Sequence, residues 1–200
     1  MINPYSITNF NRTESELQEF LLFCIVVAGK TAHIQADKLE YFLNSSKQLL
    51  SVNNDVNPFQ LLSILKQNGL LLTQILKAKL GQYNKIYNAF DYLVNNKIDL
   101  SNCTTEDLEK IPGVGLKTSR FFILHSRQIN SIAVLDVHIL KFLGTLGYNV
   151  PKTTPSKKNY YFLEQKFLEY CMANNLEPAE ADLEIWKSYA RKKQEVSIDG

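Results

Sequence analysis

The sequence has few cysteines, no long apolar run and little net charge. Its three cysteines lie far apart among 200 residues, and their odd number predicts free thiols in a reducing compartment rather than structural disulfides. No stretch is apolar over the roughly 20 residues that span a bilayer, and Met1–Pro4 lacks the basic-then-apolar layout of a signal peptide. We therefore expect an intracellular protein that does not enter a membrane.

A net charge of +2 is only a weak argument for a polyanionic partner, but the distribution of charge says more. The segment from residue 110 to residue 135 holds basic residues and no acid, which predicts a locally basic surface. These residues are Lys110, Lys117, Arg120 and Arg127. With 45% apolar and 21% charged residues, the composition is that of an ordinary globular protein.

Strand alternation and internal repeats are both absent, and apolar residues recur at helical spacing instead. Thr13 and Glu16 form a capping-box pattern before a segment so apolar that we expect a buried central helix. The sequence therefore predicts an all-α fold. Helices are expected after Thr13 and over residues 31–44, 58–67, 71–80, 85–95, 105–111, 116–127, 137–146, 156–172 and 178–193, with a loop from Asn44 to Pro58.

A sharp turn is predicted at Ile111-Pro112-Gly113-Val114-Gly115, between two helical segments. Pro112 disfavours helix at Ile111, while Gly113 and Gly115 allow positive φ and the close approach of another backbone. Free N–H groups at the start of the second helix, together with its partial positive charge, would suit a phosphate.

This turn lies in the segment Leu-x-x-Ile-Pro-Gly-Val-Gly-x-Lys-Thr, residues 108–118, which resembles the helix-hairpin-helix of DNA repair glycosylases (the HhH-GPD superfamily). Lyase-type members have a lysine two positions after the second glycine and a Val-Asp-x-His helix start about twenty residues later. Lys117 and the segment 135–138 occupy those places, and residues 80–85 resemble a further family segment.

The resemblance implies a two-lobed helical fold with the active-site cleft between the lobes. One HhH-GPD glycosylase domain would cover residues 1–200. Its first lobe would span about 58–146 and contain the hairpin at 105–127. Its second lobe would combine residues 1–57 and 147–200.

The resemblance also implies a bifunctional DNA glycosylase/AP lyase of base excision repair. Lys117 would attack C1′ of a flipped-out nucleotide, and Asp136 would activate the amine and stabilise the sugar as the base departs, before β-elimination cleaves the strand. A free lysine has a pKa of about 10.4, so the amine needs a lower pKa, which desolvation and the helix N-terminus both favour. Taken alone, Lys117 would be a phosphate contact and Asp136 an N-cap.

Other contacts with double-stranded DNA are implied for the hairpin and its neighbours. The resemblance implies that Lys30 faces the lesion. It also implies phosphate contacts by Gly113, Val114, Gly115, Thr118 and His138. The alternatives are a structural role for His138 and a solvated position for Lys30 after a helix C-cap.

Asp182 and Trp186 lie one turn apart on the last predicted helix, where an acceptor and a stacking indole could hold a purine. This pair resembles that of the archaeal-type, thermostable 8-oxoguanine glycosylases, so we expect 8-oxoguanine as the lesion. Alone, Trp186 would be a core residue. The interval from Lys117 to Asp136 is shorter than in that type. Another class of short 8-oxoguanine glycosylases has a C-terminal lysine, which this sequence lacks.

Two other functions stay open at this point: an endonuclease III-like glycosylase for oxidised pyrimidines, and a non-catalytic helix-hairpin-helix module that binds DNA. Asp136 argues against the module, because a phosphate binder gains nothing from a carboxylate beside the lysine. The four C-terminal cysteines that hold an iron–sulfur cluster in some relatives are absent, so we expect no metal, apart from a monovalent cation at the hairpin. The protein is expected to be a monomer.

Overall fold

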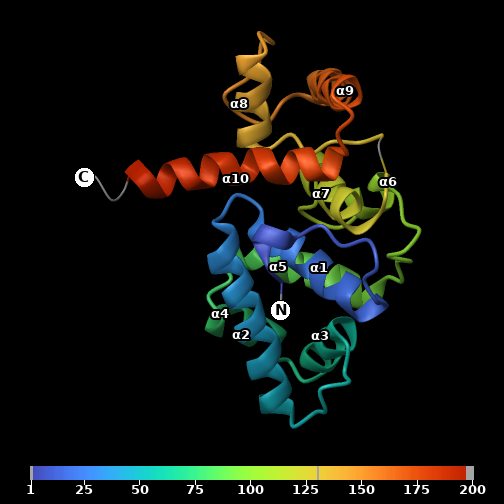
Figure 1. The fold of residues 1–200 in the computed structure, drawn as a ribbon. Helices are drawn as coiled ribbons and strands as arrows, with labels where there is room; N and C mark the ends of the chain where they lie inside the picture. Colours follow the sequence, from blue (N-terminus) through green and yellow to red (C-terminus); the bar gives the residue numbers. More distant parts are fainter. Residues whose placement is uncertain (1, 130, 197–200) are drawn as a thin grey trace. The chain divides into compact units, whose positions relative to one another are not determined.

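The computed structural model describes residues 2–129 and 131–196, and the regular secondary structure in these ranges consists of helices without strands (Figure 1). The predicted all-α fold is thereby confirmed. No helix in the described ranges is long and apolar enough to cross a membrane. The elements are η1 (Pro4–Ser6), α1 (Glu14–Val27), α2 (Ala32–Leu50), α3 (Pro58–Gln67), α4 (Leu71–Lys77), α5 (Tyr83–Asn95), α6 (Thr105–Glu109), α7 (Leu116–Ser126), α8 (Val137–Thr145), α9 (Lys157–Ala173) and α10 (Pro178–Val196).

Several predicted helix ends differ from the structure: α4 ends at Lys77 rather than at residue 80, α6 ends at Glu109 rather than at residue 111, and the largest difference is in α2. Helix α2 does not end at Asn44 but continues to Leu50, so the loop before Pro58 is shorter than predicted. Ser46 lies fully buried in this extension, and packing outweighs the modest helix propensity of serine. The helix ends at Ser51 in the left-handed region, at φ 51°, where its N–H donates to carbonyl groups of the last turn.

The chain divides into two compact units. The first consists of Met1–Pro4 and Asn11–Phe122, and the second of Tyr5–Phe10 and Ile123–Gly200. Helix α7 contributes its first part to one unit and its last part to the other. In the first unit, α1 and α2 pack with α3, α4 and α5. The lobes anticipated from the sequence stay a prediction.

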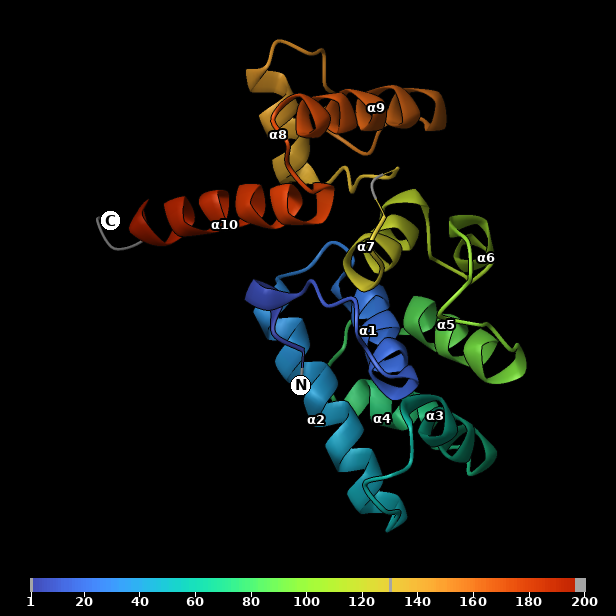
Figure 2. The same cartoon turned by 45° about the vertical axis from the view of Figure 1, so that its right-hand side comes forward.

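The first unit is built around α1, which packs against α2, α3 and α5 (Figures 1 and 2). Its residues 17–18 and 20–26 are all buried, which confirms the predicted central helix. Phe20 stacks on Phe122 of α7 with ring centroids 5.5 Å apart, and Phe42 of α2 meets Phe90 of α5 at 5.8 Å. The first ring pair joins α7 to α1, and the second joins α2 to α5.

The second unit packs α8, α9 and α10 against one another, and both views show α8 and α9 on the same side of the long α10. Phe142 of α8 contacts Phe167 and Tyr170 of α9 edge-on, at centroid distances of 6.4 Å and 4.9 Å. Tyr160, Leu163 and Phe167 of α9 are fully buried. Helix α9 therefore contributes large buried side chains to this core.

Candidate active site

Helix α6 begins with a capping box. Thr104 Oγ1 accepts a hydrogen bond from the Asp107 amide at 3.2 Å, and Asp107 accepts one from the Thr104 amide at 3.0 Å. The Lys110 ammonium also donates to Asp107, at 2.8 Å. The Lys110 contact and the bonds from Thr104 lower the pKa of Asp107 to about 2. Lys110 is thus paired with a carboxylate.

The two glycines of the turn have different structural roles. Gly113 has φ 81°, and a Cβ built on it would lie 2.5 Å from Cε of Lys85, so the turn requires glycine there. Gly115 lies outside the positive-φ region, and a Cβ on it would meet no atom within 4 Å. Gly113 therefore uses the positive φ that glycine allows, and Gly115 does not. Within the described chain, the space in front of Gly115 stays open to a ligand.

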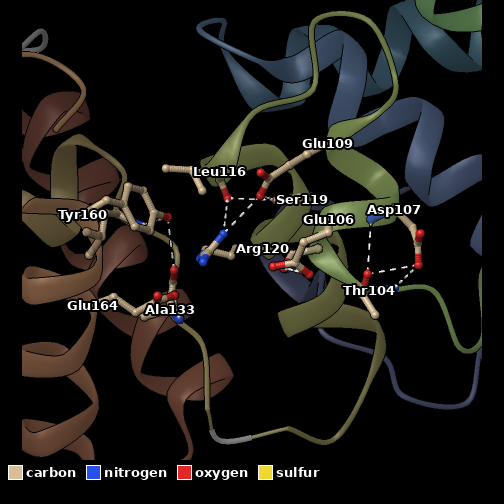
Figure 3. A network of polar contacts seen from close by, with 12 residues as sticks. Thr104, Glu106, Asp107, Glu109, Leu116, Ser119, Arg120, Ala133, Tyr160 and Glu164 are labelled. Carbon is tan, nitrogen blue, oxygen red and sulfur yellow. Dashed lines mark hydrogen bonds and ion pairs between the residues drawn. The ribbon is translucent and has the colours of Figure 1, made fainter. Parts of the chain in front are cut away.

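A buried polar cluster joins the two hairpin helices (Figure 3). Ser119 Oγ donates to Glu109 Oε1 at 3.0 Å, and the Arg120 guanidinium lies 3.4 Å from the same oxygen. Both side chains also reach the Leu116 carbonyl group, at 3.1 Å and 3.4 Å. Arg120 is only 4% exposed. Because Arg120 and Lys110 are each paired with an acid, the exposed positive charge is smaller than the sequence predicted.

Lys117 lies in the first turn of α7, where its side chain is exposed. Its charge acts on the buried Cys24 of α1. Burial raises the pKa of the Cys24 thiol well above its usual range, while the charges of Arg12 and Lys117 act in the opposite direction. Lys117 is therefore open to a substrate at the start of α7.

In the second unit, the segment that leads to Asp136 is held by α9 (Figure 3). The hydroxyl of Tyr160 accepts from the Leu135 amide at 3.0 Å and donates to the Ala133 carbonyl at 3.1 Å. Glu164 accepts from the Ala133 amide at 2.9 Å. Sequence reasoning missed Tyr160 and Glu164, because a bond between residues some 25 to 31 positions apart leaves no local pattern.

Asp136 is the N-cap of α8, as predicted. Its Oδ1 accepts from the amides of His138 and Ile139, at 2.7 Å and 2.9 Å. These bonds fix the direction of the carboxylate. The His138 ring stacks on Tyr189 of α10, with centroids 5.2 Å apart. The structure thus gives His138 a packing role, and its phosphate contact stays a prediction.

The predicted base-pocket residues both lie on α10 but differ in setting. Asp182 is buried, and its Oδ2 lies 3.1 Å from Nε2 of His125. Trp186 is half-buried, and its ring lies 5.4 Å from that of Tyr5, tilted by 60°. Neither His125 nor Tyr5 was singled out from the sequence, because each is far from α10 along the chain.

Lys30 is half-buried between α1 and the loop before α5. Its ammonium donates to the carbonyl groups of Val26 at 3.0 Å and Leu80 at 2.7 Å. Burial lowers its pKa to about 8, with a smaller effect from the charge of Lys85. The alternative of a solvated lysine is thereby wrong, while the contact of Lys30 with DNA stays a prediction.

The Leu80 carbonyl that Lys30 contacts begins the segment 80–85, which resembles a family segment. A shallow pocket of about 330 Å³ is lined by Gln82, Tyr83, Asn84 and Lys85 at the start of α5. Within the described ranges, no group of three or more His, Cys, Asp or Glu residues is placed to hold a metal ion. All three cysteines are buried free thiols.

Comparison with solved structures defines the class of fold. The 8-oxoguanine glycosylase/lyase of Methanocaldococcus jannaschii, solved with a 15mer DNA containing 8-oxoguanine, superposes with a TM-score of 0.64 at 21% identity, covering 92% of this chain and 84% of the other. The 8-oxoguanine DNA glycosylase of Thermotoga maritima gives 0.60 at 20% identity, covering 92% and 85%. The fold is therefore that of the helix-hairpin-helix DNA glycosylases.

Sequence comparison narrows the class to a family. The model of the helix-hairpin-helix 8-oxoguanine DNA glycosylases matches residues 1–176. The 8-oxoguanine DNA glycosylase/AP lyase of Picrophilus torridus is 26% identical over 176 residues, 83% of this chain and 75% of the relative. The enzyme of that name from Thermoplasma acidophilum is 37% identical over 79 residues, 40% of this chain and 37% of the relative. The chain belongs to the helix-hairpin-helix 8-oxoguanine DNA glycosylase family.

Proposed function

We propose that this protein is a bifunctional 8-oxoguanine DNA glycosylase and AP lyase that acts on damaged duplex DNA in base excision repair. The observation that carries the proposal is the exposed Lys117 in the first turn of α7, two residues after Gly115, in a chain that belongs to this family. A lysine in this position has the access to substrate that an amine nucleophile needs.

The chemistry begins when Asp136 takes a proton from the Lys117 ammonium. The amine nitrogen then bonds to C1′ as the glycosidic bond breaks, and the base leaves with the bonding pair and is protonated. The Schiff base that forms when the sugar ring opens acidifies the C2′ proton, whose loss expels the 3′ phosphate and cleaves the strand. Two hydrogen bonds from backbone amides to the Asp136 carboxylate support its role. They hold the carboxylate in one direction, so it need not reorient during the reaction.

The hairpin contributes affinity that does not depend on base sequence. Gly113 gives the turn its shape, and the open space at Gly115 allows a phosphate to approach the backbone N–H groups at the start of α7. Thr118 lies half-buried in the same turn of α7 and offers a hydroxyl donor. The proposal includes a monovalent cation at this turn, bound by backbone carbonyl groups, because carbonyl oxygens can replace the hydration shell of potassium.

Asp182 and Trp186 supply the lesion specificity in this proposal. An 8-oxoguanine base carries a proton on N7 that guanine lacks, so a carboxylate acceptor gains a hydrogen bond only with the lesion. A stacking indole stabilises either purine. The placement of both residues on one side of α10 supports this division of roles. The proposal also takes the protein to be an intracellular monomer, because its substrate is the DNA inside the cell.

Excision from matched duplexes tests the function. Single-turnover rates are measured on duplexes that carry 8-oxoguanine, thymine glycol or a preformed abasic site in one sequence context. We expect 8-oxoguanine to be released faster than thymine glycol, and the abasic site to be cleaved. Faster release of the oxidised pyrimidine would assign the protein to the endonuclease III type of activity. Binding without release or cleavage would make it a DNA-binding module.

A further inference from the structure

His125, near the end of α7, bridges two parts of the second unit. Its side chain is completely buried. Nδ1 lies 2.8 Å from Thr8 Oγ1, and Nε2 lies 3.1 Å from Asp182 Oδ2. The backbone contributes as well, because the Asn9 amide donates to the His125 carbonyl at 3.1 Å. Three segments far apart in the sequence therefore meet at one imidazole.

The bonding partners assign the tautomer of this ring. An ionised carboxylate only accepts hydrogen bonds, so Nε2 carries the proton and donates to Asp182. In a neutral ring Nδ1 is then an acceptor, and the Thr8 hydroxyl donates to it. Both nitrogens are satisfied in this arrangement, which is the condition for burying an imidazole without a large free-energy penalty.

The segment that holds His125 also reaches the second predicted pocket residue. Tyr5 packs its ring against Trp186, and Ile7, between Tyr5 and Thr8, is buried in the unit. The N-terminal residues 5–9 thus contact Trp186 directly and act on Asp182 through His125. This connection is unrelated to the hairpin and to Lys117.

We propose that His125, held by Thr8, is a positioning residue that orients the Asp182 carboxylate for recognition of the damaged base. The inference rests on the proposed function, because it takes Asp182 as the acceptor for the N7 proton. A carboxylate has about four acceptor positions, and the bond from His125 limits its rotation. Without that donor, the buried carboxylate loses a hydrogen bond that sets its direction.

Two substitutions at the same position separate the two bonds. In His125→Gln the side-chain amide nitrogen can replace Nε2 as the donor to Asp182, whereas His125→Asn reaches only the Thr8 side of the site. Thr8→Val removes the hydroxyl and Thr8→Ser keeps it. Ser188→Ala serves as a control on α10, because it deletes a hydroxyl that bonds only its own helix at the Ile185 carbonyl.

The readout is the rate of 8-oxoguanine excision divided by the rate of cleavage of a preformed abasic site, which has no base to recognise. His125→Asn should lower this ratio roughly 10- to 100-fold, the effect of losing a hydrogen bond to a charged group. His125→Gln should retain most of the ratio, as should Thr8→Ser relative to Thr8→Val. Thermal unfolding of each variant shows whether the fold is retained.

Several results would overturn the proposal. Equal effects of His125→Gln and His125→Asn would show that the donor to Asp182 is irrelevant, and equal loss of excision and abasic-site cleavage would show a merely structural role. Nitrogen NMR of the parent should show the Nε2–H tautomer of His125, and the Nδ1–H tautomer would contradict the inference whatever the activity. A parent that cleaves abasic sites but leaves 8-oxoguanine in place would refute the lesion assignment and the positioning role with it.

Discussion

The two glycines of the hairpin offer a comparison in which fold and DNA binding separate. Gly113→Ala puts a Cβ into the left-handed region and against Cε and Cγ of Lys85, at 2.5 Å and 2.7 Å. The left-handed conformation costs an alanine roughly 1–2 kcal/mol, and the movement of Lys85 adds to that. Gly115→Ala meets no atom within 4 Å and keeps an ordinary φ. Alanine there should leave stability unchanged or raise it by roughly 0.4–1 kcal/mol.

DNA affinity should respond in the opposite order to stability. A methyl group on Gly115 occupies the space that a phosphate needs, and the loss of one hydrogen bond to a charged group is worth roughly 1.5–3 kcal/mol, or about 10- to 100-fold in affinity. The loss should be alike for lesion and undamaged duplex, because phosphate contacts carry no base information.

Thermal unfolding and fluorescence anisotropy with both duplexes measure the two effects. For a chain of this size each kcal/mol corresponds to roughly 2–4 °C, so Gly113→Ala should lower the melting temperature measurably and Gly115→Ala should not. Gly115→Ala that binds DNA as tightly as the parent would refute the assignment of the hairpin to phosphate. A loss of affinity confined to lesion duplex would show instead that the turn takes part in reading the base.

Three further predictions concern single side chains. Asp182→Asn should reduce the preference for 8-oxoguanine over guanine roughly 10- to 100-fold. Trp186→Ala should weaken the binding of both bases alike. Excision and binding assays on duplexes that differ only in this base measure both effects. Tyr160→Phe should cost roughly 1–3 kcal/mol of unfolding free energy, because the buried Leu135 amide loses its acceptor; a denaturant midpoint equal to that of the parent would contradict this. The pKa of Lys30 is about 8 in the folded protein, against 10.5 for an ordinary lysine. Between pH 8 and pH 10 the unfolded chain therefore binds a proton that the folded protein lacks. The free energy of unfolding of the parent, relative to that of Lys30→Met, should rise over this range. Denaturant unfolding of both proteins at several pH values gives this difference, and the contribution of the buried cysteines cancels because both proteins contain them. A difference that does not change with pH would refute the prediction.

Local features of the fold could be predicted from the sequence because their cause lies within a few residues. Thr13 and Asp136 each cap a helix as predicted, since a capping side chain bonds amides two or three positions along the chain. The boundary of α2 could not be predicted in this way. Its last turns hold two serines, and the burial of Ser46 against other elements decides their conformation.

The candidate site shows the same division between local and distant causes. The motif identified Lys117 and the turn, but only the coordinates show that Gly113 requires positive φ and Gly115 does not. The sequence also predicted more exposed positive charge than the fold presents, because Arg120 pairs with Glu109 on the other hairpin helix. The bond between Thr8 and His125 spans 117 positions, and no pattern in one sequence indicates it.

Covalent trapping tests the central claim that Lys117 is the nucleophile. The protein is incubated with an 8-oxoguanine duplex and borohydride, which reduces a Schiff base to a stable amine, and the crosslinked residue is identified by mass spectrometry. Lys110→Gln is the matched control, because Lys110 is an exposed lysine of the same hairpin that pairs with Asp107. The account predicts a crosslink on Lys117 in the parent and in Lys110→Gln, and none in Lys117→Gln. Trapping by Lys117→Gln at the level of the parent would contradict it.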